Sequence, residues 1–179
     1  MDYMKLSKEV SFALRHEPWK YELELDENGW VDIDQLIESL RCDRKWKSLD
    51  RKDLEIMIEK SDKKRHEIHN SKIRALYGHS TPQKIVKADK IPPDVLYHGT
   101  PKYFIESIRE KGLIPKSRQY VHLSSDTETA IQVGKRRAEN PIILKINAKQ
   151  ASIDGVKFYH ANDTIWLVDS IDPKYIIEK

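Results

Sequence analysis

A proline-punctuated segment near the middle of the chain separates two stretches of different character. Residues 81–94 contain Pro82 and the run Ile91-Pro92-Pro93, and proline fixes the backbone and lacks an amide donor. Apolar residues recur at helical spacing before this segment, whereas short apolar runs bounded by turn residues dominate after it. The sequence therefore predicts an α+β protein with a lobe at residues 1–80, a linker at 81–94 and a second lobe at 95–179.

The opening part of the first lobe predicts two helices around a strand. Residues 4–16 have apolar side chains three or four positions apart, which indicates a helix that Pro18 ends. A short strand that closes in a glycine-containing turn is expected within residues 23–30. A helix over residues 34–40 follows, with Asp34 as its expected N-cap.

The rest of the first lobe completes a familiar order of elements. A third helix is expected over residues 50–61, and two short strands follow at 65–68 and 72–76, joined by a turn at Asn70-Ser71. Three helices followed by a β-ribbon are typical of a winged-helix-like lobe. We assign this architecture to residues 1–80.

The second lobe predicts a mostly β structure with two helices. One helix is expected over residues 104–111, stopped by Gly112, and another over 127–135, capped by Ser124-Ser125-Asp126. The expected strands are short and lie at residues 95–97, 121–123, 141–146, 158–159, 165–168 and 176–177.

Several classes of protein are excluded by what the sequence lacks. The single cysteine, Cys42, excludes an internal disulfide and a cysteine-based zinc site. No apolar run approaches the roughly 20 residues of a membrane helix, and the opening residues lack the apolar core of a signal peptide. No phosphate-binding, dinucleotide-binding or metal-ligand motif is present. We expect a cytoplasmic monomer with no metal and no membrane partner.

The net charge of +3 conceals an uneven distribution of charge along the chain. Residues 41–52 and 60–74 each carry six lysines or arginines, whereas residues 22–38 carry seven acids and no base. Such segregation is compatible with a phosphate-bearing polymer on the basic side. Solvated faces of an ordinary charged protein would produce the same pattern.

The stretch Lys72–Ser80 concentrates candidate functional groups. Arg74 stands in an otherwise apolar phrase, and a guanidinium is a fixed fork of donors suited to phosphate. Lys72 lies two residues before Arg74, so a strand would place both on one face. His79 and Ser80 follow within a few residues.

Other candidates stand where predicted elements end. Arg15 and His16 fall in the last turn of the first helix, where cations also favour the helix dipole without any further role. His98 and His122 each close a predicted strand, where a histidine bonds a ribose hydroxyl or simply supports the fold. Gly99 would let backbone approach a ligand closely.

Five motifs in series resemble the NAD-dependent RNA 2′-phosphotransferases, the tRNA 2′-phosphotransferase family. They occur in order and with similar spacing along nearly the whole chain. The motifs are Leu14-Arg15-His16, Ile73-Arg74-Ala75 through Gly78-His79-Ser80, Leu96-Tyr97-His98-Gly99-Thr100, Tyr120-Val121-His122-Leu123-Ser124, and Gly134-Lys135-Arg136 followed by Pro141.

The resemblance implies a winged-helix lobe followed by an ADP-ribosyltransferase-like lobe, and a two-step reaction without metal. An internal RNA 2′-phosphate, of the kind left by tRNA splicing, attacks the nicotinamide ribose of NAD and expels nicotinamide. The 2″-hydroxyl then attacks the phosphorus. The products are RNA with a 2′-hydroxyl, ADP-ribose 1″,2″-cyclic phosphate and nicotinamide.

The resemblance also implies roles for individual residues. The catalytic set is Arg15, His16, Arg74 and Arg136. The NAD-binding set is His98, Gly99, Thr100, Leu123, Ser124 and Asp126, with His122 as structural support. The residues expected near the substrate phosphate are Lys72, His79 and Ser80.

The sequence departs from the commoner family pattern in two places. Tyr77 stands where many members have glutamine, and could stack or hydrogen-bond instead. Arg137 stands where many have histidine, in a loop about one residue longer, which leaves two candidates for the last arginine. We prefer Arg136 because of its register with Gly134.

Two other functions remain open at this point. An ADP-ribosyltransferase that stops after one step would share the NAD site but needs no second-step arginines, and capping of phosphorylated RNA ends could accompany the main reaction. A winged-helix DNA binder with a ligand-sensing second lobe would need a basic recognition helix, whereas residues 50–61 are mixed in charge. The physiological RNA is not specified by the sequence.

Overall fold

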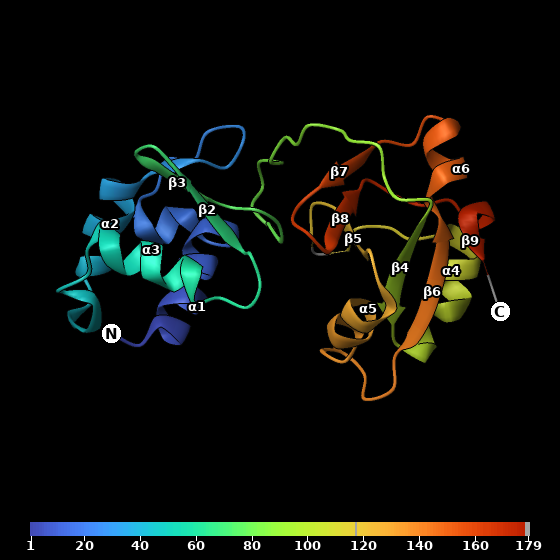
Figure 1. Cartoon of the computed structure of the whole chain (residues 1–179), viewed down its shortest axis with the longest axis horizontal. Helices are drawn as coiled ribbons and strands as arrows, with labels where there is room; N and C mark the ends of the chain where they lie inside the picture. Colours follow the sequence, from blue (N-terminus) through green and yellow to red (C-terminus); the bar gives the residue numbers. More distant parts are fainter. Residues whose placement is uncertain (117, 178–179) are drawn as a thin grey trace. The chain divides into compact units, whose positions relative to one another are not determined.

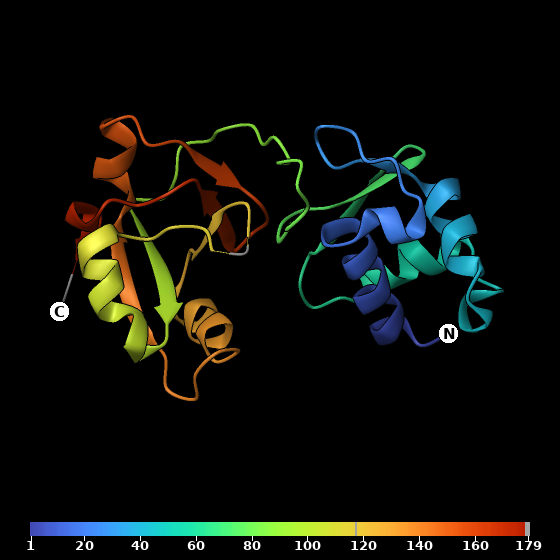
Figure 2. The same cartoon turned by 180° about the vertical axis from the view of Figure 1, so that it is seen from behind.

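The computed structural model describes residues 1–116 and 118–177. The chain divides into two compact units, 1–86 and 87–179 (Figures 1 and 2). Each unit has its own hydrophobic core. The division falls within the proline-punctuated segment. Both units combine helices with antiparallel sheet, which agrees with the predicted α+β class.

The first unit packs helices against a small sheet. Its sheet has the strand order β1-β3-β2, with all pairs antiparallel. The elements are α1 (Tyr3–Arg15), η1 (Pro18–Tyr21), β1 (Val31–Asp32), α2 (Ile33–Arg41), η2 (Arg44–Trp46), α3 (Arg51–Glu59), β2 (His66–His69) and β3 (Lys72–Ala75), where η marks a 3-10 helix.

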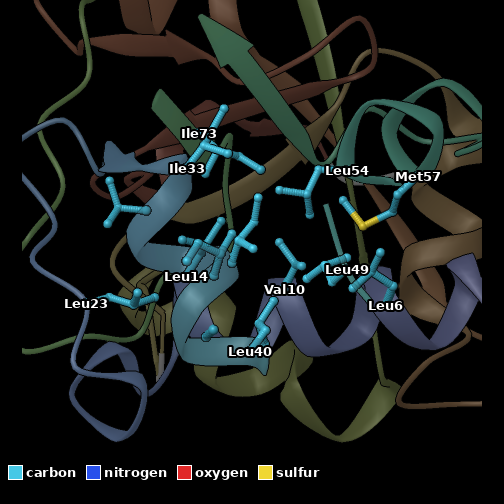
Figure 3. Close-up of a cluster of buried hydrophobic side chains, with 14 of the residues drawn as sticks. Leu6, Val10, Leu14, Leu23, Ile33, Leu40, Leu49, Leu54, Met57 and Ile73 are labelled. Carbon is cyan, nitrogen blue, oxygen red and sulfur yellow. The ribbon is translucent and has the colours of Figure 1, made fainter. Parts of the chain in front are cut away.

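The core of this unit follows from the helical periodicity of the sequence. Figure 3 shows leucine, valine, isoleucine and methionine side chains from α1, α2, α3 and β3 gathered in one cluster. In α1 the buried residues recur three or four positions apart, as in Leu6, Val10 and Leu14. Asp50 and Asp53 form a capping box at the start of α3, so this helix begins where the sequence predicts.

The strand expected within residues 23–30 does not form. Instead, the Asp26 carboxylate accepts the backbone amides of Asn28 (3.0 Å) and Trp30 (2.9 Å), and these bonds hold the segment as a turn. The strand of this region is β1, which pairs with β3 through Val31 opposite Ile73. The missed signal was the local bonding capacity of an aspartate, which competes with a strand ladder.

The start of α2 also differs from the expectation. The N-cap is Asp32 rather than Asp34, because the Asp32 carboxylate accepts the Asp34 amide (2.9 Å). The helix therefore begins at Ile33, whose side chain is buried in the core.

The second unit is built on a six-stranded antiparallel sheet of order β7-β8-β5-β4-β6-β9. Figures 1 and 2 show α4 and α5 on opposite sides of β4 and β6. The elements are β4 (Val95–Thr100), η3 (Lys102–Phe104), α4 (Ile105–Lys111), β5 (Val121–Ser124), α5 (Thr127–Gly134), β6 (Ile142–Asn147), α6 (Ala148–Ile153), β7 (Phe158–His160), β8 (Ile165–Val168), η4 (Pro173–Tyr175) and β9 (Ile176–Ile177).

Two expectations for the second unit were wrong. A third helix, α6, is present, and its six residues are too few to produce a readable helical period. Strand β4 runs on through His98, Gly99 and Thr100, which were expected to follow it, because β6 pairs with the whole segment up to Thr100 opposite Ile142. No helix among the described residues has the length and apolar content that crossing a membrane requires.

Candidate functional site

The C-terminal end of α1 meets the segment that follows β3. Arg15 is the last residue of α1, and His16 is its C-cap. The Ser80 amide donates to the carbonyl oxygen of Arg15 (2.8 Å), and the Ser80 hydroxyl oxygen lies 2.7 Å from Nδ1 of His16. These bonds bring together three of the predicted site residues from two distant parts of the sequence.

The residues just before Ser80 pack against the side chain of Arg15. The Cζ atom of Arg15 lies 5.0 Å from the centre of the Tyr77 ring, which is a cation–π distance. Gly78 has φ +87°, a conformation that glycine adopts at little cost, and a Cβ atom there would lie 3.6 Å from Cδ of Arg15. Tyr77 therefore stacks on a candidate phosphate-binding arginine.

A buried neutral histidine lies near the same arginine. His66, the first residue of β2, is buried, and its Nε2 atom lies 3.0 Å from the hydroxyl oxygen of Ser11, one turn before Arg15 in α1. Burial, aided by the positive charges of Arg15 and Arg65, lowers the pKa of His66 to about 3. The ring is uncharged at neutral pH, so it adds no positive charge beside Arg15.

Arg74 contacts three other parts of the first unit. Its Nε and Nη2 atoms bond the carboxylate of Glu67, which lies directly opposite in the register of β2 and β3. Its Cζ atom lies 4.4 Å from the centre of the Trp30 ring, and Nη1 lies 3.5 Å from the carbonyl oxygen of Asn28. These contacts orient a guanidinium whose side chain remains 24% exposed.

The turn before β1 supports several of the predicted residues. Lys72 is exposed on β3, with Nζ 3.6 Å from the Asp26 carboxylate. His79 is buried against Gly29 of the same turn, where an added Cβ atom would lie 3.4 Å from its Nε2 atom. Together with the Asn28 carbonyl at Arg74, these contacts tie the turn both to β3 and to the segment that bonds His16.

The second unit contains the residues that the resemblance relates to NAD. The Nδ1 atom of His98 on β4 lies 2.9 Å from the carbonyl oxygen of His122 on β5, and this bond fixes the ring. Burial lowers the pKa of His98, and the positive charges of Arg137 and Lys116 act in the same direction. The neutral form of the ring is therefore favoured. His122 takes part in this bond through its backbone carbonyl.

Two glycines allow α5 to approach its neighbours. A Cβ atom at Gly99 would collide with the carbonyl oxygen of Ala130 in α5, and a Cβ atom at Gly134 would lie 2.6 Å from Cβ of Pro141. The close approach expected at Gly99 is thus made by a helix of the same unit. Gly134 places α5 and the start of β6 in contact, on either side of the loop that contains Arg136.

The other NAD-related candidates differ in accessibility. The side chain of Leu123 is fully buried in the core, and those of Thr100 and Ser124 are nearly so. The Asp126 carboxylate caps α5 by accepting the amide (2.7 Å) and the hydroxyl (2.9 Å) of Thr129. The side chain of Leu123 therefore offers no accessible surface.

The two candidates for the last arginine follow α5 and are both exposed. Burial lowers the pKa of Arg118, and the positive charges of Arg137 and Arg136 act in the same direction. Burial also lowers the pKa of Lys116, again with the charge of Arg137 acting in the same direction. Lys116 lies with Nζ 2.8 Å from the centre of the Phe104 ring. The four cations form a positively charged group in the second unit, of which sequence reasoning missed Lys116 and Arg118.

Sequence reasoning also missed the partners of the predicted residues in the first unit. Glu67, Trp30 and His66 carry no motif, but a turn at Asn70-Ser71 implies that Glu67 pairs with Arg74 across the ribbon. Within residues 1–116 and 118–177, no cluster of three or more histidine, cysteine, aspartate or glutamate residues could hold a metal ion. The site chemistry of this unit is that of guanidinium, imidazole and hydroxyl groups.

Comparisons with known proteins agree with the sequence motifs. The family model described as RNA 2′-phosphotransferase, Tpt1 / KptA family, matches residues 2–170. A protein of Acetivibrio thermocellus is 62% identical over 176 residues, which cover 98% of this chain and 97% of the relative. A protein of Bacillus thuringiensis subsp. konkukian is 58% identical over 97% of this chain and 94% of the relative. A third, from Pseudomonas aeruginosa, is 42% identical over 96% and 94%.

All three relatives bear the name probable RNA 2′-phosphotransferase. The family model and the relatives cover both units and all five motifs from Leu14 to Pro141. The predicted family is confirmed: the chain belongs to the RNA 2′-phosphotransferases of the Tpt1 / KptA family.

Proposed function

We propose that this protein removes an internal 2′-phosphate from RNA by transferring it to NAD. The observation that carries the proposal is the grouping of Arg15, His16 and Ser80 at the end of α1, in the unit that also presents Arg74. Membership in the family and the names of the relatives support the transfer of an RNA 2′-phosphate. NAD as the acceptor rests on the resemblance of the motifs.

The proposed reaction consists of two displacements. In the first, a 2′-phosphate oxygen of the RNA forms a bond to the nicotinamide-ribose carbon, and the bond to nicotinamide breaks. In the second, the 2″-hydroxyl forms a bond to phosphorus, and the bond from phosphorus to the RNA 2′-oxygen breaks. The attacking 2″-hydroxyl gives up its proton, the RNA 2′-oxygen gains one, and the phosphate leaves as ADP-ribose 1″,2″-cyclic phosphate.

The arginines suit the charge of the substrate. A 2′-phosphate beside a 3′,5′-diester is densely anionic, and guanidinium groups bind phosphate oxygens in pairs. Arg15 and Arg74 hold the phosphate and stabilise charge on the transferring group, and Arg136 supplies the third guanidinium. Lys72 lies on the same face of β3 as Arg74 and is a further phosphate contact.

His16 is the residue that moves a proton. Its Nδ1 atom is 2.7 Å from the Ser80 hydroxyl, and the imidazole exchanges a proton with the phosphate or with the departing 2′-oxygen. Ser80 orients the ring. His79, which is buried, shapes the turn rather than touching the phosphate in this scheme.

The second unit is the proposed NAD-binding lobe, of the ADP-ribosyltransferase kind, and the first is the proposed winged-helix-like lobe. His98 suits a ribose hydroxyl of a dinucleotide, because its ring favours the neutral form and is anchored to a backbone carbonyl of β5. The residues proposed to line the NAD site are His98, Gly99, Thr100, Leu123, Ser124 and Asp126. We extend the proposal to a cytoplasmic monomer acting on tRNA-type splice junctions without metal.

One incubation tests the proposal. Purified protein, NAD and a short RNA with a single internal 2′-phosphate are mixed in the presence of a chelator, and the products are read by mass. We expect loss of the phosphate from the RNA and formation of the cyclic-phosphate ADP-ribose. A stable ADP-ribosylated RNA would indicate a one-step transferase, and unchanged RNA with bound NAD would indicate a binding module. Loss of turnover on chelation alone would reveal a required metal.

A further inference from the structure

The anion-binding edge of Arg74 is already occupied by an acidic residue of the same unit. Glu67 lies opposite Arg74 in the β2–β3 ladder, and its carboxylate bonds both Nε and Nη2 of the guanidinium. This edge is one of the two through which a guanidinium forms paired bonds to a carboxylate or phosphate. A substrate phosphate that uses this edge must displace Glu67.

Arg74 has two contacts besides Glu67 that hold its position. The guanidinium stacks at 4.4 Å on the Trp30 ring, and Nη1 lies 3.5 Å from the Asn28 carbonyl oxygen. Both contacts involve the turn before β1, which the Asp26 carboxylate holds through two backbone amides. The stack and the carbonyl would therefore keep the guanidinium in place when the Glu67 carboxylate moves away.

The surroundings of Glu67 allow its carboxylate to leave Arg74 and to return. Its side chain is 40% exposed. Among the described residues, Arg74 is the only hydrogen-bond or ion-pair partner of the Glu67 carboxylate. A half-exposed carboxylate with one partner can rotate into solvent at little cost, because exposed ion pairs contribute little stability.

We propose that Glu67 is a specificity-determining residue: a phosphate monoester displaces its carboxylate from Arg74, whereas a phosphate diester does not. This inference rests on the proposed function of the site. A diester carries one negative charge, as Glu67 does, but Glu67 has the advantage of being tethered beside the guanidinium. A 2′-phosphomonoester carries between one and two charges at neutral pH, with three terminal oxygens, and so competes better.

The need for such a residue follows from the chemistry of the substrate. Every nucleotide of an RNA contributes a backbone diester, whereas the reacting monoester occurs once. An uncovered Arg74 would bind backbone phosphates along the whole RNA, because phosphate contacts by arginine carry no sequence information. Glu67 raises the affinity that a phosphate needs in order to bind Arg74, and it leaves the other lysines and arginines of the surface uncovered.

The test compares the affinities of one variant for two RNAs. Kd is measured by fluorescence anisotropy, without NAD, for a short RNA with one internal 2′-phosphate and for the same RNA without it. In Glu67→Gln the side chain keeps its shape but loses its charge. We expect the unphosphorylated RNA to bind about fivefold more tightly than to the parent protein, and the preference for the 2′-phosphate to fall by a similar factor.

Glu55→Gln is the matched control. Glu55 lies on α3 in the same unit and pairs with Arg51 at 2.9 Å, so its replacement removes the same charge from a similar ion pair. We expect this variant to change the two affinities by equal factors and to keep the preference of the parent protein.

The outcomes separate this inference from the function on which it rests. An unchanged preference in Glu67→Gln, or weaker binding of both RNAs, would overturn the inference and leave Glu67 as a mere support for Arg74. A parent protein that binds the two RNAs equally and releases no phosphate would instead contradict the proposed function. If the preference falls equally in Glu55→Gln, the loss of one negative charge from the unit explains the effect, and this result would also overturn the inference.

Discussion

The Nδ1 atom of His16 lies 2.7 Å from the hydroxyl oxygen of Ser80, although 64 positions separate the two residues in the sequence. The backbone supports the same contact, because the Ser80 amide donates to the carbonyl oxygen of Arg15 at 2.8 Å. The end of α1 and the segment after β3 are thus held together at two points. The orientation of the proposed proton-transfer residue depends on this junction.

Replacement of Ser80 by alanine should lower kcat more than it raises KM. The hydroxyl orients the imidazole, and loss of that bond should cost about tenfold in kcat, a part of what acid–base catalysis supplies. Ser80→Thr keeps a hydroxyl and should recover most of the rate. Ser48→Ala, at an exposed serine of the same unit, is the control. Equal kcat values for Ser80→Ala and the control would contradict the role of Ser80.

Replacement of Arg74 by alanine should abolish most turnover while the protein stays folded. Loss of one charge-stabilising donor typically costs a factor of about 100 to 1,000 in rate. The lost stack on Trp30 should cost only about 1 kcal/mol of stability. Single-turnover rates and thermal melts measure the two effects.

Arg51→Ala is a close match for this experiment, because Arg51 also bonds a glutamate, Glu55, and a backbone carbonyl, that of Asn70. We expect Arg51→Ala to retain its turnover. A fully active Arg74→Ala protein would remove Arg74 from the catalytic set.

The buried His66 should make the first unit less stable in acid. The pKa of His66 is lowered to about 3 by burial, so below the unfolded value of about 6.5 the unfolded chain binds a proton that the folded chain does not. The free energy of unfolding should therefore fall with falling pH between about 6.5 and 3, by up to about 1.4 kcal/mol per pH unit.

Urea unfolding at a series of pH values checks this expectation. His66→Gln should flatten the dependence in that window, because glutamine does not titrate. His69→Gln, at an exposed position of the same strand, should leave the dependence as it is. Identical pH profiles for His66→Gln and the parent protein would show that another group controls acid unfolding.

Replacement of Gly99 by alanine should destabilise the second unit. The added Cβ atom would meet the backbone carbonyl of Ala130, which cannot move without shifting α5, so we expect a loss of about 1–3 kcal/mol of unfolding free energy. Gly155→Ala is a useful contrast, because φ there is +99° but no atom lies within 4 Å of an added Cβ. Denaturant unfolding of both variants separates backbone strain from collision. A Gly99→Ala protein as stable as its parent would contradict the packing described for α5.

The two arginines after α5 should differ in their effect on turnover. We expect Arg136→Ala to lose at least about 100-fold in rate, because the proposal assigns this arginine to the catalytic set. Arg137→Ala should lose less, and it should raise the pKa of His98, since the charge of Arg137 holds that pKa down. Single-turnover rates and the NMR titration of His98 test the two parts. A larger rate loss in Arg137→Ala would exchange the two assignments.

Much of the local structure could be predicted because its causes lie within a few residues. Apolar spacing and Pro18 determine the end of α1, and Gly112 stops α4. The strand expected within residues 23–30 did not form because Asp26 bonds nearby amides, and α6 was not predicted because a helix of fewer than two turns carries little periodic signal. The conformation of such short segments depends on the residues that pack against them in space.

The sequence by itself determined the chemical groups of the proposed site, since motifs record which side chains are present and in what order. Arg15, His16 and Arg74 could be named on that basis. Only the tertiary structure decided that Ser80 lies against His16 and that Glu67 and Trp30 surround Arg74. Such contacts depend on strand register and on the packing of α1 against β3, and packing joins residues by shape and burial, whatever their separation along the chain.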